Sequence, residues 1–192
     1  MQNLFDRLAN ADETALDEIY ELFHIKVYNT VLGYLQNQDD AEEITQDVFV
    51  EIFKSASKFK GQSSPGTWIY RIAVNKSLDF IRYKQRKKRF ADVRRLFSGS
   101  LDSPVLDIPD FNHPGVVAEN KENAAILFKV IDTLPENQKT AFILSYVEEL
   151  SRQEVADIME VTLKSVDSLL FRAKGSLKNK LSDYYPNRVK KK

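Results

Sequence analysis

Residues 150–181, LSRQEVADIMEVTLKSVDSLLFRAKGSLKNKL, decide the fold of the second half of this chain. The stretch predicts two short helices separated by a turn, which is the outline of a helix-turn-helix. Ser151 and Glu154 have the spacing of a capping box, so the first helix is predicted to begin at Ser151. The segment EVTLK, residues 160–164, is the predicted turn, and Ser165 is the predicted cap of the second helix.

The two predicted helices each have an apolar face. Apolar residues recur at helical spacing, and these are expected to be buried: Val155, Ile158, Met159, Val166, Leu169, Leu170, Ala173 and Leu177. The opposite side of the second helix presents polar, cationic and aromatic residues, namely Lys164, Ser165, Ser168, Phe171, Arg172 and Lys178. Helix N-termini favour phosphate, and such side chains fit a major groove. An ordinary helical hairpin with a solvated basic face fits the same spacings, so both interpretations stay open at this point.

The rest of the chain also has helical periodicity. One stripe comprises Leu16, Ile19, Tyr20, Phe23, Val27 and Val31, and a second comprises Ala41, Ile44, Val48 and Ile52, in a helix expected to start at Asp40. Ser64 followed by Pro65 predicts the start of a helix that runs to about Arg89. Leu134-Pro135 predicts another start. We therefore expect an all-α fold.

A long segment without helical period divides the chain. Residues 96–118, LFSGSLDSPVLDIPDFNHPGVVA, contain prolines and glycines that interrupt any helix. A loop of this length is unusual inside one compact domain. We therefore expect two small helical domains, residues 1–95 and 119–192, joined by a flexible linker at 96–118.

Charge is segregated along the chain although the formal net charge is zero. The stretch from Arg82 to Arg95 holds eight Lys or Arg residues against one Asp, and the C-terminal tail NRVKKK is also basic. The segment DDAEEITQD, residues 39–47, is acidic and contains no base. Two oppositely charged surfaces in one half of the chain indicate two kinds of partner.

Several classes of protein are disfavoured by what the sequence lacks. There are no cysteines, which excludes disulfides and thiolate catalysis. No apolar run is long enough to span a membrane and no secretory leader is present, so a cytoplasmic protein is expected. The chain has no P-loop, no Gly-x-Ser-x-Gly and only two distant histidines, His24 and His113. We expect no catalytic residue, no metal site and no cofactor.

Two blocks of sequence resemble one family. LPENQKTAFILSYVEELSRQEVADIMEVTLKSVDSLLFRAKGSL resembles region 4 of the extracytoplasmic-function (ECF) sigma factors of the sigma-70 family. DAEEITQDVFVEIFKSASKFKGQSSPGTWIYRIAVNKSLDFIRYKQRKK is similar to region 2 of the same family. The blocks lie in the expected order on either side of the linker. Two residues depart from the pattern, since Glu160 stands where a glycine is usual and Lys164 where another often stands.

The resemblance implies a protein that binds core RNA polymerase and promoter DNA. The recognition helix of the second domain would read the upstream (-35) element. The first domain would recognise and open the downstream (-10) element, with the loop Gly61, Gln62, Ser63 and Ser64 holding a flipped base. The polymerase contacts would be the clamp helices of the largest subunit and the flap of the second-largest. An anti-sigma factor is a further candidate partner.

The residues of the first block fit such a melting surface. One helical face carries Trp68, Asn75, Asp79, Arg82 and Arg86, with Arg71 beside it. An aromatic ring can stack on unpaired bases, and arginines can contact phosphates. Core packing is the alternative for Trp68. The run Arg86–Arg89 is expected to contact phosphate rather than only solvent.

The acidic helix also has more than one interpretation. Its carboxylates could form a solvated face or hold a metal, but the Glu-x-x-His motif of carboxylate metal bundles is missing. Under the resemblance they form the dock for the clamp helices, with Asp40, Glu43, Gln46 and Asp47 as the contact residues. Ile52 and Phe53 are expected in the core. The functional alternative to a sigma factor is a dimeric helix-turn-helix regulator whose residues 1–95 sense a signal or dimerise.

Overall fold

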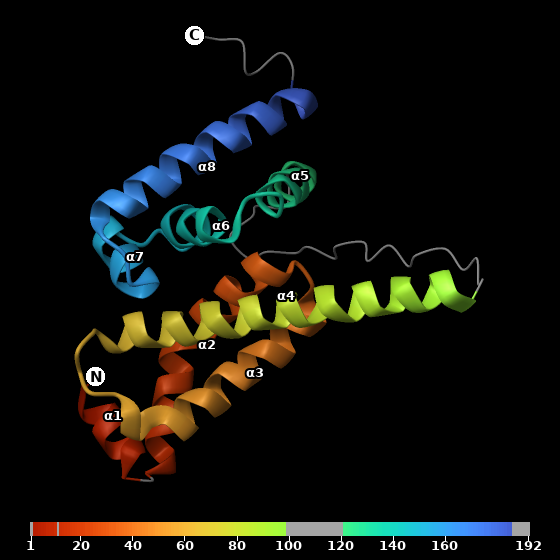
Figure 1. The fold of residues 1–192 in the computed structure, drawn as a ribbon. Helices are drawn as coiled ribbons and strands as arrows, with labels where there is room; N and C mark the ends of the chain where they lie inside the picture. Colours follow the sequence, from red (N-terminus) through yellow and green to blue (C-terminus); the bar gives the residue numbers. More distant parts are fainter. Residues whose placement is uncertain (1, 11, 99–120, 186–192) are drawn as a thin grey trace.

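The computed structural model describes residues 2–10, 12–98 and 121–185, and within these ranges the chain is helical and contains no strand (Figure 1). The all-α prediction is confirmed. The first half contains α1 (Gln2–Ala9), α2 (Glu13–Leu35), α3 (Gln38–Ser55), the short 3₁₀ helix η1 (Ala56–Lys58) and α4 (Pro65–Ser98). The second half contains α5 (Lys121–Ile131), α6 (Glu136–Phe142), the π-helix η3 (Ile143–Val147), α7 (Arg152–Met159) and α8 (Leu163–Tyr184).

Polar side chains start the long helices of the first half. Asp12 accepts a hydrogen bond of 3.1 Å from the amide of Thr14 at the start of α2. Asn37 accepts one of 2.9 Å from the amide of Asp40, so α3 begins before the predicted start at Asp40. The amide of Thr67 donates 3.0 Å to the hydroxyl of Ser64, which confirms the predicted start of α4. Each cap satisfies an amide that the helix leaves without a partner.

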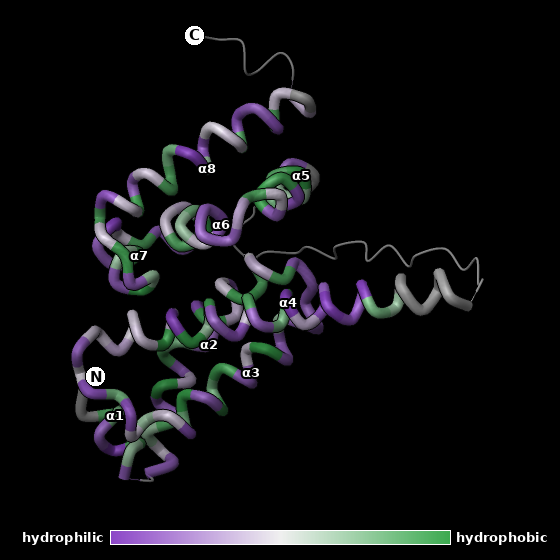
Figure 2. The backbone as a smooth tube through the Cα atoms, viewed as in Figure 1, coloured by the Kyte–Doolittle hydropathy of each residue, from purple (hydrophilic) through white to green (hydrophobic). Residues whose placement is uncertain are grey.

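The first hydrophobic core is formed by α1 to α4. Ile19, Val48 and Ile52 are fully buried within it, as their helical spacing predicts. Tyr20, which was expected in the same stripe, is 43% exposed because it lies at the edge of the stripe, stacked on His24. Figure 2 shows hydrophobic and hydrophilic stretches alternating along α2 and α3, as expected for helices with one buried face.

The second core is shared between the two halves of the chain. Helices α5 to α8 supply most of it, including Ile143, Val166 and Leu170. Residues from the first half complete it, namely Tyr34 of α2 and Tyr70 and Val74 of α4. The two helical units are therefore packed against each other through apolar side chains (Figure 1).

Helix α4 is longer than the sequence pattern indicated. It continues past Arg89 to Ser98 and so enters the segment 96–118 that was predicted to be a linker. Lysine and arginine are good helix formers, so the basic run extends the helix. Residues 99–118 of that segment lie outside the described residues, and so does the basic tail. None of the helices that the structure describes is both long and apolar enough to cross a bilayer.

Candidate nucleic-acid interface

Helix α4 presents the polar face that the sequence predicted. Asn75, Asp79, Arg82 and Arg86 are all exposed, and their spacing places them along one side of the helix. The guanidinium of Arg82 donates a hydrogen bond of 3.2 Å to Asp79. The face thus offers an amide for base edges and two cations for phosphates, which is a composition suited to unpaired DNA.

Trp68 lies at the end of this face and is half-buried. Its ring centroid is 5.4 Å from that of Phe5 and 5.3 Å from that of Phe59. These contacts place one side of the indole against the first core, so Trp68 has a packing role, and its contact with DNA stays a prediction.

The loop before α4 has a conformation that depends on glycine. Gly61 has φ of 66°, in the left-handed region that other residues rarely adopt. Gln62 and Ser64 are exposed, whereas Gly61 and Ser63 are half-buried. The hydroxyl of Ser64 already accepts from the amide of Thr67 and lies 2.8 Å from its hydroxyl. Gln62 and Ser63 are therefore the polar side chains of this loop with free hydrogen-bonding capacity in the structure.

The acidic side of α3 is partly apolar. Glu43, Gln46 and Asp47 are exposed, and the same side of the helix continues through Val50, 48% exposed, and Phe53, 41% exposed. The prediction that Phe53 lies in the core was wrong, because it falls on the solvent side of α3 while Ile52 takes the buried position. Sequence periodicity did not single out Val50 or Phe53 as surface residues. Together the five residues form a surface with an acidic and an apolar end, which we call the α3 surface.

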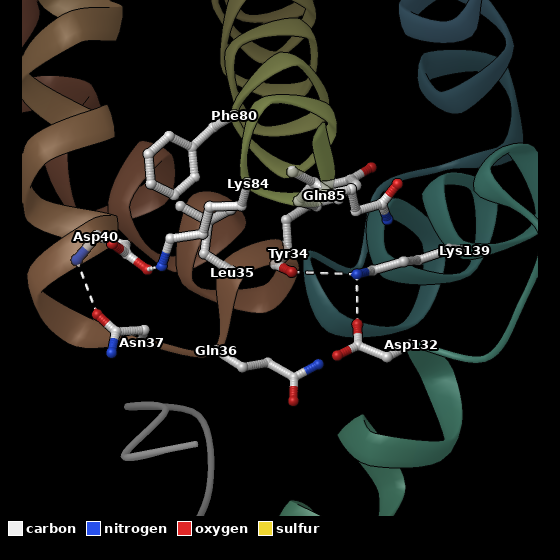
Figure 3. A pocket seen from close by; sticks show the side chains of 11 residues that line it. Tyr34, Leu35, Gln36, Asn37, Asp40, Phe80, Lys84, Gln85, Asp132 and Lys139 are labelled. Atoms are coloured by element: carbon white, nitrogen blue, oxygen red, sulfur yellow. Dashed lines mark hydrogen bonds and ion pairs between the residues drawn. The ribbon is translucent and has the colours of Figure 1, made fainter. Parts of the chain in front are cut away.

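Asp40 differs from the other acidic residues predicted to form this dock. It is half-buried at the first turn of α3 and forms an ion pair with Lys84 of α4 (Figure 3). Its carboxylate is therefore less available to a partner than those of Glu43 and Asp47. Among the residues that the structure describes, no group of three or more His, Asp or Glu side chains is arranged to hold a metal ion.

The helix-turn-helix is formed by α7 and α8. The predicted capping box at Ser151 is confirmed, with the amide of Ser151 donating 2.9 Å to Glu154 and the amide of Glu154 donating 3.3 Å to the Ser151 hydroxyl. Helix α7 ends at Met159, and its C-cap residue Glu160 has φ of 56°. The prediction that Ser165 caps α8 was wrong, because Thr162 is the cap and accepts from the Ser165 amide at 3.2 Å. Helix α8 therefore begins a turn earlier, and the connection is shorter than EVTLK.

The outer side of α8 carries the predicted recognition residues. Lys164, Arg172 and Lys178 are exposed, Ser165 and Ser168 are half-buried, and Phe171 is 80% exposed. A shallow depression on this side is lined by Lys164, Asp167, Ser168, Phe171 and Arg172. This side of α8 therefore combines an exposed aromatic ring with the cations Lys164 and Arg172.

Two further cations lie at a position that the sequence reasoning did not identify. Lys174 Nζ of α8 is 4.6 Å from the ring centroid of Tyr146, and the Arg152 guanidinium of α7 is 5.5 Å from the same centroid. Lys174 and Arg152 together lower the pKa of the Tyr146 phenol. The three residues come from η3, α7 and α8, so no single-helix pattern could have connected them.

Comparison with known proteins assigns both halves of the chain. Residues 19–87 match the model of sigma-70 region 2, and residues 125–177 match the model of sigma-70 region 4. The ECF RNA polymerase sigma-E factor of Escherichia coli K12 is 28% identical over 180 residues, covering 94% of this chain and 93% of its own. That of Haemophilus influenzae is 29% identical over 180 residues, covering 94% of each chain.

The chain belongs to the ECF sigma factors. Solved structures agree on the fold of this sigma factor. CnrH in complex with the cytosolic domain of CnrY superposes with a TM-score of 0.66 at 16% identity, covering 95% of this chain and 97% of CnrH. RpoE of Bartonella quintana in complex with the anti-sigma factor NepR superposes with a TM-score of 0.58 at 19% identity, covering 86% of this chain and 96% of RpoE.

The family assignment gives each surface of this sigma factor a place in region 2 or region 4. Region 2 spans most of α2, α3 and the part of α4 up to residue 87, and region 4 spans α5 to α8 up to residue 177. Since residues 19–87 match region 2, the alternative of a dimeric helix-turn-helix regulator with a sensing module at residues 1–95 is not favoured.

Proposed function

We propose that this sigma factor binds core RNA polymerase and directs it to promoters that it recognises at two elements. Region 4 reads the upstream (-35) element with the exposed side of α8, and region 2 recognises and opens the downstream (-10) element with the α4 face and the loop Gly61–Ser64. Sigma factors act by binding, and the chain contributes no chemical step of its own. The domain limits proposed for these roles are residues 1–95 and 119–192.

The recognition helix supports the upstream role. Phe171 and Arg172 are exposed side chains on a helix side that begins with the exposed Lys164 in the first turn of α8. A helix-turn-helix inserts the N-terminal part of its second helix into the major groove, where arginine can read guanine and an apolar group can contact a thymine methyl.

The α4 face supports the downstream role. Asn75 carries an amide that can donate to and accept from a base edge, while Arg82 and Arg86 can follow the phosphates. A base turned out of the stack loses a few kcal/mol of stacking and pairing, which contacts with the protein must replace. Gln62 and Ser63 lie in the loop that precedes this face and have side chains free to make such contacts.

The α3 surface is the proposed dock for the clamp helices of the largest subunit. Its exposed apolar end, Val50 and Phe53, adds buried area to the acidic contacts of Glu43 and Asp47. Charged residues steer association and set specificity, whereas apolar side chains supply most of the affinity. Region 4 is the proposed partner of the flap, and an anti-sigma factor is the proposed negative regulator.

The single observation that carries this function is the match of one half of the chain to sigma-70 region 2 and of the other to sigma-70 region 4, the regions that hold the α4 face and the helix-turn-helix. Purified core polymerase mixed with this protein should start RNA synthesis at defined sites on genomic DNA, and core polymerase alone should not. RNA ends mapped by sequencing should share two upstream motifs. Random or absent initiation would contradict the proposal.

A further inference from the structure

A cavity of about 360 Å³ lies where the end of α2, the start of α3 and the middle of α4 meet region 4 (Figure 3). Small-molecule sites in proteins usually have volumes of about 300 to 1,000 Å³, so the cavity is large enough for a ligand. It opens on a different side of α4 from the ion pairs of Arg71 with Glu160 and of Arg82 with Glu136. The cavity is therefore separate from the side chains proposed to contact promoter DNA.

Region 2 supplies an apolar wall to this cavity. The wall consists of Leu35 of α2 and Phe80 and Ile81 of α4, which are each half-buried. Lys84 Nζ lies 5.2 Å from the ring centroid of Phe80, at one edge of the wall. A flat apolar group placed on this wall would remove more of its surface from water, which favours binding.

The charged side chains of the cavity neutralise each other in pairs. Lys84 forms an ion pair with Asp40, and Lys139 forms one of 2.5 Å with Asp132 (Figure 3). Lys139 is only 7% exposed and also donates 3.1 Å to the carbonyl of Tyr34. The described residues that line the cavity thus carry no net charge. A charged ligand would lose hydration there without gaining a counter-ion, so the cavity favours a neutral one.

Three amide side chains also line the cavity and retain hydrogen-bonding capacity. Gln36 donates 3.2 Å to the carbonyl of Phe128, which leaves its own side-chain oxygen as an acceptor. Asn37 accepts 2.9 Å from the amide of Asp40, which leaves its side-chain NH₂ as a donor. Gln85 makes no side-chain hydrogen bond with any residue that the structure describes. The cavity thus offers both donors and acceptors beside an apolar wall.

We propose that this cavity binds a small neutral heteroaromatic molecule with hydrogen-bond donors and acceptors on its edge, which is the chemistry of an uncharged nucleobase. The flat ring lies against the apolar wall. Its edge pairs with the amides of Gln36, Asn37 and Gln85. This binding of a small molecule is distinct from the proposed recognition of promoter DNA.

The ligand contacts both regions of the protein. Asp132 and Lys139 belong to region 4, and the apolar wall and the three amides belong to region 2. The complete cavity exists only while the regions are in contact. A ligand that needs both sides therefore stabilises this arrangement in proportion to its occupancy.

The first test is a titration of the full-length protein, labelled with nitrogen-15, with four nucleosides: adenosine, guanosine, cytidine and uridine. At least one should cause saturable shifts of backbone amide resonances on both sides of the cavity, at residues 35–37 and 80–85 and at residues 132–139. Absence of saturable shifts with all four at millimolar concentration would overturn the proposed ligand class. Shifts confined to one region would overturn the shared site.

The matching nucleoside monophosphate tests the preference for a neutral ligand. It carries the same base and adds a charged phosphate, which the paired charges of the cavity cannot neutralise. Its affinity for the same residues should be several-fold lower than that of the nucleoside. Tighter binding of the monophosphate at these residues would overturn the assignment of a neutral ligand.

Variants at Gln85 test the position of the site. Gln85→Ala removes one amide and should weaken binding of the nucleoside about 2- to 12-fold. Gln85→Trp fills the cavity and should abolish binding. The matched controls, Asn179→Ala and Asn179→Trp, change an exposed amide of α8 outside the cavity and should bind like the parent. Thermal unfolding gives a second measurement, since the nucleoside should raise the melting temperature of N179W and not of Q85W. Equal affinity of Q85W and N179W would overturn the site.

Discussion

Arg152 and Tyr146 are joined twice, by a hydrogen bond of 3.1 Å from the guanidinium to the phenol oxygen and by the guanidinium lying 5.5 Å from the ring centroid. Lys174 approaches the same ring from α8. Arg152 is the first residue of α7, so its charge adds to the N-terminal dipole of that helix. The Tyr146 ring thus fixes two cations beside the helix-turn-helix, and we propose that they contact the DNA backbone when the recognition helix is docked.

Replacing Arg152 or Lys174 with alanine should weaken binding to the upstream element equally for all sequences. Such phosphate contacts carry no base information, and each lost contact should reduce the slope of log affinity against log salt by about 1. Fluorescence anisotropy at several salt concentrations measures both effects. Arg172→Ala provides the comparison, since loss of a base contact should cost about 1 to 3 kcal/mol and relax preference at one position. A change of base preference in R152A would contradict its role.

Reversing the charge of the α3 surface should weaken binding to core polymerase. Glu43→Lys with Asp47→Lys changes two exposed residues and should leave the fold intact. Pull-down with core polymerase should recover less of this variant. The matched control, Asp17→Lys with Glu21→Lys, reverses two exposed acids at the same spacing on α2 and should be captured like the parent.

Truncating the apolar end of the same surface gives an independent check on this dock. Val50→Ser with Phe53→Ser removes exposed apolar area and should raise the dissociation rate. Full capture of both the charge-reversed and the apolar variant would exclude the α3 surface as the polymerase contact.

Asn75→Ala combined with Ser63→Ala should impair promoter opening more than the first binding of duplex DNA. The changed groups are proposed to contact bases only after the strands separate. Holoenzyme with the variant should initiate poorly on duplex templates and be rescued in part on templates that already contain a bubble. Reactivity of unpaired thymines measures opening. Opening at the parental rate would place the melting surface elsewhere.

Docking of the two regions should depend on pH through Glu148. Burial raises the pKa of Glu148 to about 7, although Thr30, Tyr70 and the charge of Lys26 act in the opposite direction. A carboxyl whose pKa is higher in the docked form binds its proton more tightly there, so low pH favours docking. This stabilisation of the docked form is complete below about pH 4.3, the pKa of a free glutamate, and is lost as the pH rises through 7.

Spin labels on cysteines introduced at the exposed positions Lys58 and Lys180 report the distance between the two regions, and this distance should increase from pH 5.5 to pH 8.0. Glu148→Gln keeps the side chain uncharged and should remove most of the dependence. Glu149→Gln, at the neighbouring exposed position, is the control and should behave like the parent. Identical pH profiles for the parent and E148Q would show that another group controls docking.

The start of α8 can be tested by stability. Thr162→Ala should lower the free energy of unfolding by about 1 kcal/mol, because it removes the cap that accepts from the Ser165 amide. Ser165→Ala should cost less, since its hydroxyl only pairs with that of Thr162. Thermal unfolding followed by circular dichroism compares the two. A larger loss of unfolding free energy in S165A than in T162A would show that Ser165, and not Thr162, caps α8.

Local sequence signals predicted local structure well. The capping box at Ser151 and the Ser64-Pro65 start of α4 each depend on residues within one turn, and both are present in the structure. The cap of α8 was placed wrongly because Thr162 and Ser165 are both good caps, and only the hydrogen bonds of the fold distinguish them. Phe53 was placed in the core because an aromatic residue is usually buried, yet Ile52 takes that position.

The contact between the regions could not be read from the sequence. Tyr34 and Val74 belong to apolar stripes that look like ordinary core positions of the first domain, and periodicity does not say which helix covers them. The partners of Arg71 and Arg82 are distant in sequence and come from two different helices. The recognition and melting residues were named from one-helix patterns and family resemblance, which do not say what lies over each face, and their roles stay predictions.

Glu160, the C-cap residue of α7, can be changed to glycine by a single mutation. A glutamate codon becomes a glycine codon through a single base change, and at position 160 that change would relax the backbone while freeing Arg71. Losing this ion pair would therefore bring a more stable turn, whereas most substitutions lower stability. Thermal unfolding of the Glu160→Gly variant should consequently show a melting temperature no lower than that of the parent.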